Sequence, residues 1–181
     1  MPFEFRRLGI PDLILIEAKR FGDARGFFQE AWRKAAFEKA GIPSFTQINW
    51  SRSRKGTLRG LHFQKPPKAQ GKLIMVLRGG IFDVAVDVRK GSPTYGKWEA
   101  VTLSEAKGEM LYVPAGFAHG FCVTSEEADV LYQVTSEYAP DLDRGVLWND
   151  PALAIPWPVA KPELSPKDAI LPLLKDADTP F

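Results

Sequence analysis

Both histidines of this 181-residue chain lie in short motifs bounded by glycine. Gly56 precedes His62 by six positions, and an Arg-Gly pair stands just before this histidine. Gly108 begins the second motif, which continues through a Pro-Ala-Gly-Phe-Ala turn to His119. Two motifs of this kind in this order are hard to obtain by chance. They constrain the fold of the chain more than any other feature of the sequence.

The spacing of these motifs resembles the two half-signatures of the cupins. This resemblance implies a mostly β fold, a cupin-type jelly-roll β-barrel with short peripheral helices. A length of 181 residues suits one well-buried core and is short for two. We therefore expect a single domain over residues 1–181.

The first motif departs from the metal-binding form of the signature. A metal-binding cupin carries a second histidine two positions after the first, followed by a carboxylate. Here Gln64 takes that position, and residues 65–72 contain three lysines and no acid. We therefore expect no metal. His62 is then available for proton transfer and Lys72 as a fixed positive charge, which points to chemistry beside a carbonyl.

Charge and composition narrow the class of protein. Lysines and arginines number 24 against 22 acids, which excludes the strongly basic surface of a dedicated nucleic-acid binder. Neither a signal peptide nor a run of membrane-spanning length is recognisable, so we expect a cytoplasmic protein that does not associate with membranes. Cys122 is the sole cysteine and is expected to be a buried strand residue.

Apolar and β-branched runs predict short strands separated by turns. Residues 73–77 and 81–88 flank Arg78-Gly79-Gly80, which predicts a tight hairpin. A loop is expected around residues 22–26. Further strands are predicted at 13–16, 99–103, 110–113, 120–124 and 130–135, as in a jelly roll.

Two segments have helical signals. Residues 31–40 have helix-forming composition and end at Gly41, so one short helix is predicted there. Ser165-Pro166-Lys167-Asp168 has a capping serine, a proline at the first position and an acid in the first turn, which predicts the start of a second helix.

Beyond single motifs, the chain resembles the dTDP-4-dehydrorhamnose 3,5-epimerases, which are metal-free cupin enzymes. The resemblance implies the substrate dTDP-4-dehydro-6-deoxy-D-glucose and the product dTDP-4-dehydro-β-L-rhamnose, with neither a redox cofactor nor a metal. A C4 ketone acidifies the C–H bonds at C3 and C5, and inversion needs a base and an acid on opposite faces of the ring. The matching segments are 21–28, 47–49, 59–64, 70–73, 83–89, 92–96, 114–121, 148–151 and 164–168.

Four positions match the catalytic residues of that family. The resemblance implies that His62 is the base and that Asp168 orients its imidazole and stabilises the imidazolium. It implies that Tyr132 is the proton donor on the opposite face. Lys72 matches the cation that stabilises negative charge on the C4 oxygen. Taken alone, a strand tyrosine is usually a packing residue and a lysine usually lies on the surface, and Asp168 also suits a helix cap.

Other positions match substrate-binding residues. Arg25 and Arg59 can each offer a planar fork to diphosphate oxygens. Tyr138 matches the aromatic position that stacks on thymine, and Asp143 stands where many members carry glutamate. Structural roles in turns or at strand edges remain open for several of them. The remaining matches are Glu30, Gln47, Asn49, His119 and Lys167.

Three alternatives remain open from the sequence. A mono-epimerase acting at C3 or C5 only would share this fold, although the presence of Tyr132 favours double epimerisation. A cupin that binds a nucleotide sugar or another anion without turning it over, or that serves as a subunit in an assembly, would not need His62, Tyr132 and Lys72 together. A metal-dependent cupin is disfavoured by Gln64. The resemblance also implies a homodimer in which N-terminal strands extend the partner's sheet.

Overall fold

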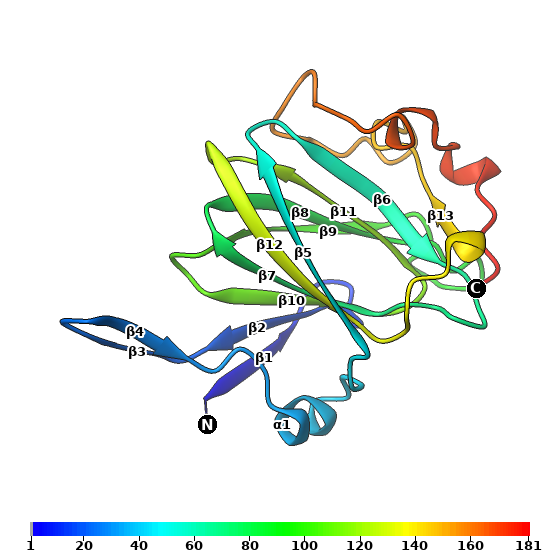
Figure 1. Ribbon diagram of the computed structural model, residues 1–181. Coiled ribbons are helices and arrows are strands. Elements are labelled where there is room, and N and C mark those ends of the chain that lie inside the picture. Colours follow the sequence, from blue (N-terminus) through cyan, green and yellow to red (C-terminus); the bar gives the residue numbers. More distant parts are fainter. Residues whose placement is uncertain (1) are drawn as a thin grey trace.

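The computed structural model describes residues 2–181 and consists mainly of two antiparallel sheets that face each other (Figure 1). The mostly β, jelly-roll prediction is confirmed. The first sheet has the order β1 (Phe3–Arg7), β2 (Ile14–Ala18), β10 (Glu109–Val113), β7 (Lys72–Arg78), β12 (Glu127–Val134), β5 (Gln47–Arg54). The second has the order β13 (Asp143–Gly145), β6 (Leu58–Gln64), β11 (Phe117–Val123), β8 (Gly80–Asp87), β9 (Trp98–Ser104).

Side chains alternate between the space inside the barrel and its outer faces, as the two-residue period of a strand requires. In β7, Ile74 and Val76 join the cluster between the sheets, whereas Leu73 belongs to the outer cluster around α1 (Lys34–Lys39). In β8, Ile81 and Ala85 lie in the inner cluster. Each fully buried aliphatic side chain contributes roughly 1.5–3 kcal/mol.

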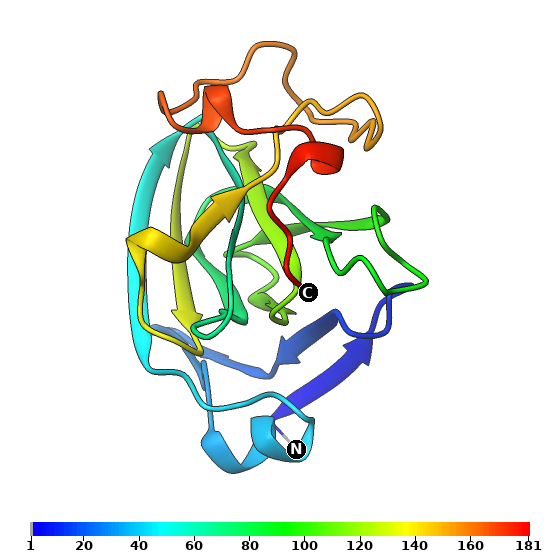
Figure 2. The same ribbon diagram turned by 90° about the vertical axis from the view of Figure 1, so that its right-hand side faces the viewer.

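Each outer face is covered by a different segment. Phe37 of α1 packs edge-on against Phe3 and Phe5 over the six-stranded sheet. The C-terminal segment crosses the five-stranded sheet and buries Leu153 and Leu174 there (Figure 2). Its 3-10 turns are η2 (Asp168–Ile170) and η3 (Leu174–Asp176), and η1 (Pro140–Leu142) precedes β13.

A short hairpin projects from the body of the barrel (Figure 1). It is formed by β3 (Arg20–Asp23) and β4 (Gly26–Gln29), so the loop predicted at 22–26 is the tip of a two-stranded ribbon. Its aromatic side chains Phe21, Phe27 and Phe28 are exposed. The edge strand β5 likewise exposes Ile48 and Trp50, so apolar surface is available in both places.

Three local predictions need correction. The hairpin between 73–77 and 81–88 is wrong, because β7 pairs with β10 and β12 whereas β8 pairs with β9 and β11. The chain changes sheets there, and Gly79 has a positive φ of 75° at the turn. The helix predicted over 31–40 is limited to α1, Lys34–Lys39. The second predicted helix is the single 3-10 turn η2.

β6 and β11 approach each other very closely at two glycines. A Cβ atom on Gly60, which has a φ of 128°, would lie 2.5 Å from the Cα of Gly120. A Cβ on Gly120 would lie 2.7 Å from the carbonyl oxygen of Arg59. The contact coincides with an irregularity in the strand pairing, beside which His62 and His119 stand directly opposite each other.

Candidate active site

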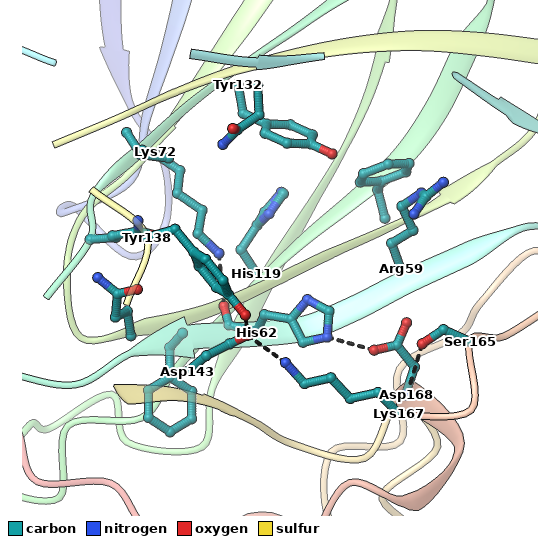
Figure 3. A pocket seen from close by; sticks show the side chains of 16 residues that line it. Arg59, His62, Lys72, His119, Tyr132, Tyr138, Asp143, Ser165, Lys167 and Asp168 are labelled. Carbon is teal, nitrogen blue, oxygen red and sulfur yellow. Dashed lines mark hydrogen bonds and ion pairs between the residues drawn. The ribbon is translucent and has the colours of Figure 1, made fainter. Parts of the chain in front are cut away.

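A pocket of about 270 Å³ opens inside the barrel, between the two sheets. Its walls are inward-facing side chains of β5, β6, β7, β11 and β12, with residues of the segments before and after β13 at one side (Figure 3). The structure brings ten of the predicted site residues to this pocket. They are Asn49, Arg59, His62, Lys72, His119, Tyr132, Tyr138, Asp143, Lys167 and Asp168.

His62 and Asp168 form a close pair within this pocket. Nε2 of His62 lies 2.5 Å from Oδ1 of Asp168, although the residues are 106 positions apart. Asp168 is 3% exposed, whereas the imidazole is partly open to the pocket. The carboxylate can therefore hold the ring orientation and stabilise an imidazolium while the other ring nitrogen stays free for a substrate.

The chain just before η2 orients Asp168. The backbone N–H of Asp168 donates to Oγ of Ser165 at 3.1 Å, which is the predicted capping contact on a much shorter turn. Burial raises the pKa of Asp168, but hydrogen bonds with His62, Ser165 and the backbone of Gly60 outweigh it and lower the pKa below its ordinary value. Asp168 is thus held as an ionised partner of the histidine.

Lys72 starts β7 and points inward, where Nζ donates to the carbonyl oxygen of His62 at 3.0 Å. Burial lowers the pKa of Lys72 to about 8, although Asp143 and Asp83 favour the charged form. A cation with this pKa is still mainly protonated near neutral pH, so it can stabilise negative charge in the pocket.

Tyr132 faces the pocket from the sheet opposite to that of His62. It lies in β12 of the six-stranded sheet, whereas His62 lies in β6 of the five-stranded sheet. Figure 3 shows the phenol and the imidazole approaching the pocket from different sides. Two groups that can carry a proton therefore border the same space from opposite directions.

Arg59 and His119 line the pocket near the dyad. Nε of Arg59 donates to Oγ of Ser53 at 3.0 Å, which leaves its terminal nitrogens free for an anion. His119 lies on β11, and its Nε2 is 2.9–3.0 Å from both carboxylate oxygens of Asp83.

Three side chains meet at one side of the pocket: Tyr138 before η1, Asp143 at the start of β13 and Lys167 before η2. The hydroxyl of Tyr138 donates to Oδ2 of Asp143 at 2.9 Å, and Lys167 donates to the same oxygen. Tyr138 is 52% exposed, so a flat ligand can cover its aromatic ring. Gln47 lies beside this group, since it donates to Asn49 at 2.7 Å and accepts from the backbone N–H of Tyr138.

Arg25 and Glu30 are not brought to the pocket of their own chain. Arg25 lies at the tip of the projecting hairpin and pairs with Asp23, and Glu30 pairs with Arg33 just after the hairpin. Neither lines the pocket.

Sequence reasoning missed the function of two buried polar residues. Gln64, considered only as a poor metal ligand, donates to the carbonyl oxygens of Lys68 and Glu137 and accepts from the N–H of Ala139. It thereby ties β6 to the segment that carries Tyr138. The second of these residues is Asp83, which lies behind His119. The sequence signal that could have revealed it is an acid within the apolar pattern of β8. Among residues 2–181, no group of three His, Cys, Asp or Glu residues is placed to hold a metal.

Comparison with known proteins places the chain among sugar-nucleotide epimerases. A family model described as dTDP-4-dehydrorhamnose 3,5-epimerase matches residues 7–176. The dTDP-4-dehydrorhamnose 3,5-epimerase of Shigella flexneri is 50% identical over 171 residues, which are 93% of this chain and 94% of the relative. The dTDP-4-dehydrorhamnose 3-epimerase of Streptomyces niveus is 41% identical over 174 residues, 95% of this chain and 84% of the relative.

A solved structure has the same architecture. The dTDP-6-deoxy-D-glucose-3,5-epimerase of Legionella pneumophila, in complex with dTDP-4-keto-L-rhamnose, superposes with a TM-score of 0.92 at 46% identity. The alignment covers 96% of this chain and 93% of the other. Together with the family match over residues 7–176, this similarity shows that the chain belongs to the dTDP-4-dehydrorhamnose 3,5-epimerase family.

Proposed function

We propose that this protein inverts C3 and C5 of dTDP-4-dehydro-6-deoxy-D-glucose to give dTDP-4-dehydro-β-L-rhamnose, in the biosynthesis of dTDP-L-rhamnose. The observation that carries this proposal is the placement of His62 and Tyr132 on opposite sheets across one pocket, with Lys72 in the same pocket. Inversion at carbon requires removal of a proton from one face and delivery of another to the opposite face.

In this mechanism His62 takes the proton from the carbon next to the ketone. Asp168, 2.5 Å from Nε2, stabilises the imidazolium that forms. The electron pair of the broken C–H bond moves onto the C4 oxygen, where the Lys72 ammonium stabilises the enolate. Tyr132 then donates its proton to the opposite face of the same carbon. The same four groups can act at the second carbon after both proton carriers have exchanged with solvent.

The nucleotide is held at the side of the pocket where Tyr138 is exposed. Its ring offers a stacking surface for thymine, and Asp143 and Lys167 provide polar contacts beside it. Arg59 has free guanidinium nitrogens for the diphosphate. Asn49 and Gln47 complete this wall, and His119 is available to the sugar. Asp143 is one methylene shorter than the glutamate of many family members, which enlarges the space beside the base.

We further infer that the protein works in the cytoplasm as a homodimer and that it folds as a single domain. The exposed phenylalanines of the β3–β4 hairpin and the exposed Trp50 of edge strand β5 are suited to contact a second copy. The hairpin would then carry Arg25 and Glu30 to the pocket of the partner. None of the helices in residues 2–181 is long and apolar enough to cross a membrane.

Mixing two inactive variants tests this exchange of residues. In a mixed dimer of Arg25→Ala and His62→Asn chains, one pocket would have both an intact His62 and an intact Arg25. Activity should therefore recover when the two variants are unfolded and refolded together. If Arg25 served only its own chain, the mixture would stay as inactive as its components.

A second candidate function is epimerisation at one carbon only. It is supported by the 41% identity to a protein named as a 3-epimerase, which covers 95% of this chain. The fold and the proton-carrying residues suit either outcome, because one pair of base and acid can act once or twice.

Incubation with dTDP-4-dehydro-6-deoxy-D-glucose in deuterated water distinguishes these functions. Deuterium at both C3 and C5, located by mass spectrometry and proton NMR, with an L-configured product would support the double epimerase. Deuterium at a single carbon would move the assignment to the mono-epimerase. Substrate that binds but gains no deuterium would refute catalysis. Tyr132→Phe serves as the control, because this variant should lose inversion while it still binds the substrate.

A further inference from the structure

Asp83 is a buried acid to which the proposed mechanism assigns no role. It lies in the middle of β8, between Ile81 and Ala85 of the inner core cluster, and it is 0% exposed. A fully buried carboxylate is costly unless its charge is compensated, so its surroundings should contain a hydrogen-bond donor or a cation.

The imidazole of His119 meets this need directly. Its Nε2 lies 3.0 Å from one oxygen of Asp83 and 2.9 Å from the other, and His119 is only 6% exposed. The geometry places the proton on Nε2, because a carboxylate can only accept. Since His119 also lines the pocket, Nδ1 is the ring nitrogen left for a bound sugar.

Lys72 is the second group within the influence of Asp83. The Lys72 side chain is half-buried at the start of β7, and the charged groups around it are Asp143 of β13, Asp83 of β8 and Lys167 before η2. The two acids favour the protonated lysine, and Lys167 opposes it. His62 of β6 adds its carbonyl oxygen as an acceptor. The negative charge of Asp83 therefore acts on the cation proposed to stabilise the enolate.

We propose that Asp83 is a positioning residue with two targets: it orients His119 and fixes its tautomer, and it helps to keep Lys72 protonated while the enolate forms. The inference rests on the proposed epimerase function for the role of Lys72. The contact between Asp83 and His119 can be tested without it. Asp83 touches no substrate in this scheme and acts through its two neighbours.

Asp83→Asn is the test variant, and Asp87→Asn is its matched control. Both acids are 0% exposed and both lie in β8, but Asp87 pairs with Arg89 and Ser92 away from the pocket. Both variants lose a buried acid from the same strand. An effect seen in Asp83→Asn but not in Asp87→Asn is therefore due to the contacts of Asp83 itself. Thermal unfolding of both variants shows whether each retains the fold.

Nitrogen NMR of protein labelled with ¹⁵N-histidine tests the effect of Asp83 on His119. The chain has two histidines, so the spectrum contains two imidazoles, and a His62→Asn variant assigns them. In Asp83→Asn the Nε2 signal of His119 should move while that of His62 stays in place. In Asp87→Asn neither should move. This measurement needs no substrate, so it remains informative even if the epimerase assignment fails.

The pH dependence of kcat tests the effect of Asp83 on the protonation of Lys72. Removal of Asp83 should lower the pKa of Lys72 further below its ordinary value, because the carboxylate favours the charged form of the lysine. The protonated fraction of Lys72 should then fall by a larger factor at pH 9 than at pH 7. The loss of kcat should grow with pH in the same way. An unmoved His119 signal, or a loss equal at the two pH values, would overturn the proposal.

Discussion

Replacement of Asp168 by asparagine tests the dyad most directly. The substitution keeps the shape of the side chain and removes its charge, so the imidazole of His62 faces an amide in place of a carboxylate. The contact is 2.5 Å long, and Asp168 is almost fully buried, so bulk water cannot replace it.

The size of the effect follows from the bond that is weakened. A hydrogen bond to a charged partner contributes about 1.5–3 kcal/mol. In the proposed mechanism the imidazolium forms only as the C–H bond breaks, so this energy is lost from the transition state and not from substrate binding. At about 1.36 kcal/mol for each factor of ten, kcat should fall between roughly tenfold and 160-fold.

Steady-state kinetics of purified Asp168→Asn enzyme provide the assay. We expect kcat to fall while KM changes little, because Asp168 contacts the base and not the nucleotide. Asp150→Asn is a suitable control, since Asp150 is also buried but accepts hydrogen bonds from the backbone of Ala152 and Leu174. The reasoning is refuted if kcat of Asp168→Asn stays within twofold of wild type, or if the control loses as much.

The dyad also has a pH signature in stability. The pKa of Asp168 is lowered in the folded protein, so its ionised form stabilises the fold above the unfolded pKa, and this contribution is lost as the pH falls. Asp168→Asn should therefore be less stable than wild type near pH 7, as measured by urea unfolding. The two proteins should converge in unfolding free energy toward acid pH.

The remaining predictions concern the cation, the aromatic ring and the core. Activity should decline above pH 8 as Lys72 loses its proton, and Lys72→Met should abolish this alkaline limb while lowering kcat about 10²–10³-fold. Tyr138→Leu should raise KM about tenfold by loss of stacking worth about 1–3 kcal/mol, whereas Tyr138→Phe should change KM less; titration calorimetry with dTDP checks both. Phe37→Ala should lower the unfolding free energy by about 3–5 kcal/mol, measured with urea, because Phe37 is fully buried against the first sheet.

Most strands could be predicted because a strand has a short-range signature. The alternation of apolar residues in β8 and the β-branched run in β7 depend on neighbours within a few positions. The partner of each strand has no such signature. The predicted hairpin failed for this reason: a short connection also suits a chain that passes from one sheet to the other, and only packing of the whole barrel decides between them.

The site shows the same division between local and distant information. The motif around His62 and the family resemblance pointed to His62, Lys72 and Asp168, and the structure brings all three to one pocket. An acid within the apolar pattern of β8 marked Asp83 as unusual, but its partner His119 lies 36 positions away and could not be identified from the neighbouring residues. Arg25 matched the family but lies outside the pocket of its own chain, at the tip of the projecting hairpin, and the sequence carried no sign of that position.

The contact between Gly60 and Gly120 sets a limit on how this enzyme can be altered by selection. A single added methyl group at either position would collide with the backbone of the neighbouring strand and shift His62 relative to His119. Libraries that randomise the chain should therefore recover almost no functional clones changed at these glycines. Substitutions around Tyr138, which lies on an irregular segment, should be far better tolerated. New nucleotide preferences can thus arise by stepwise mutation while the proton-transfer centre stays unchanged.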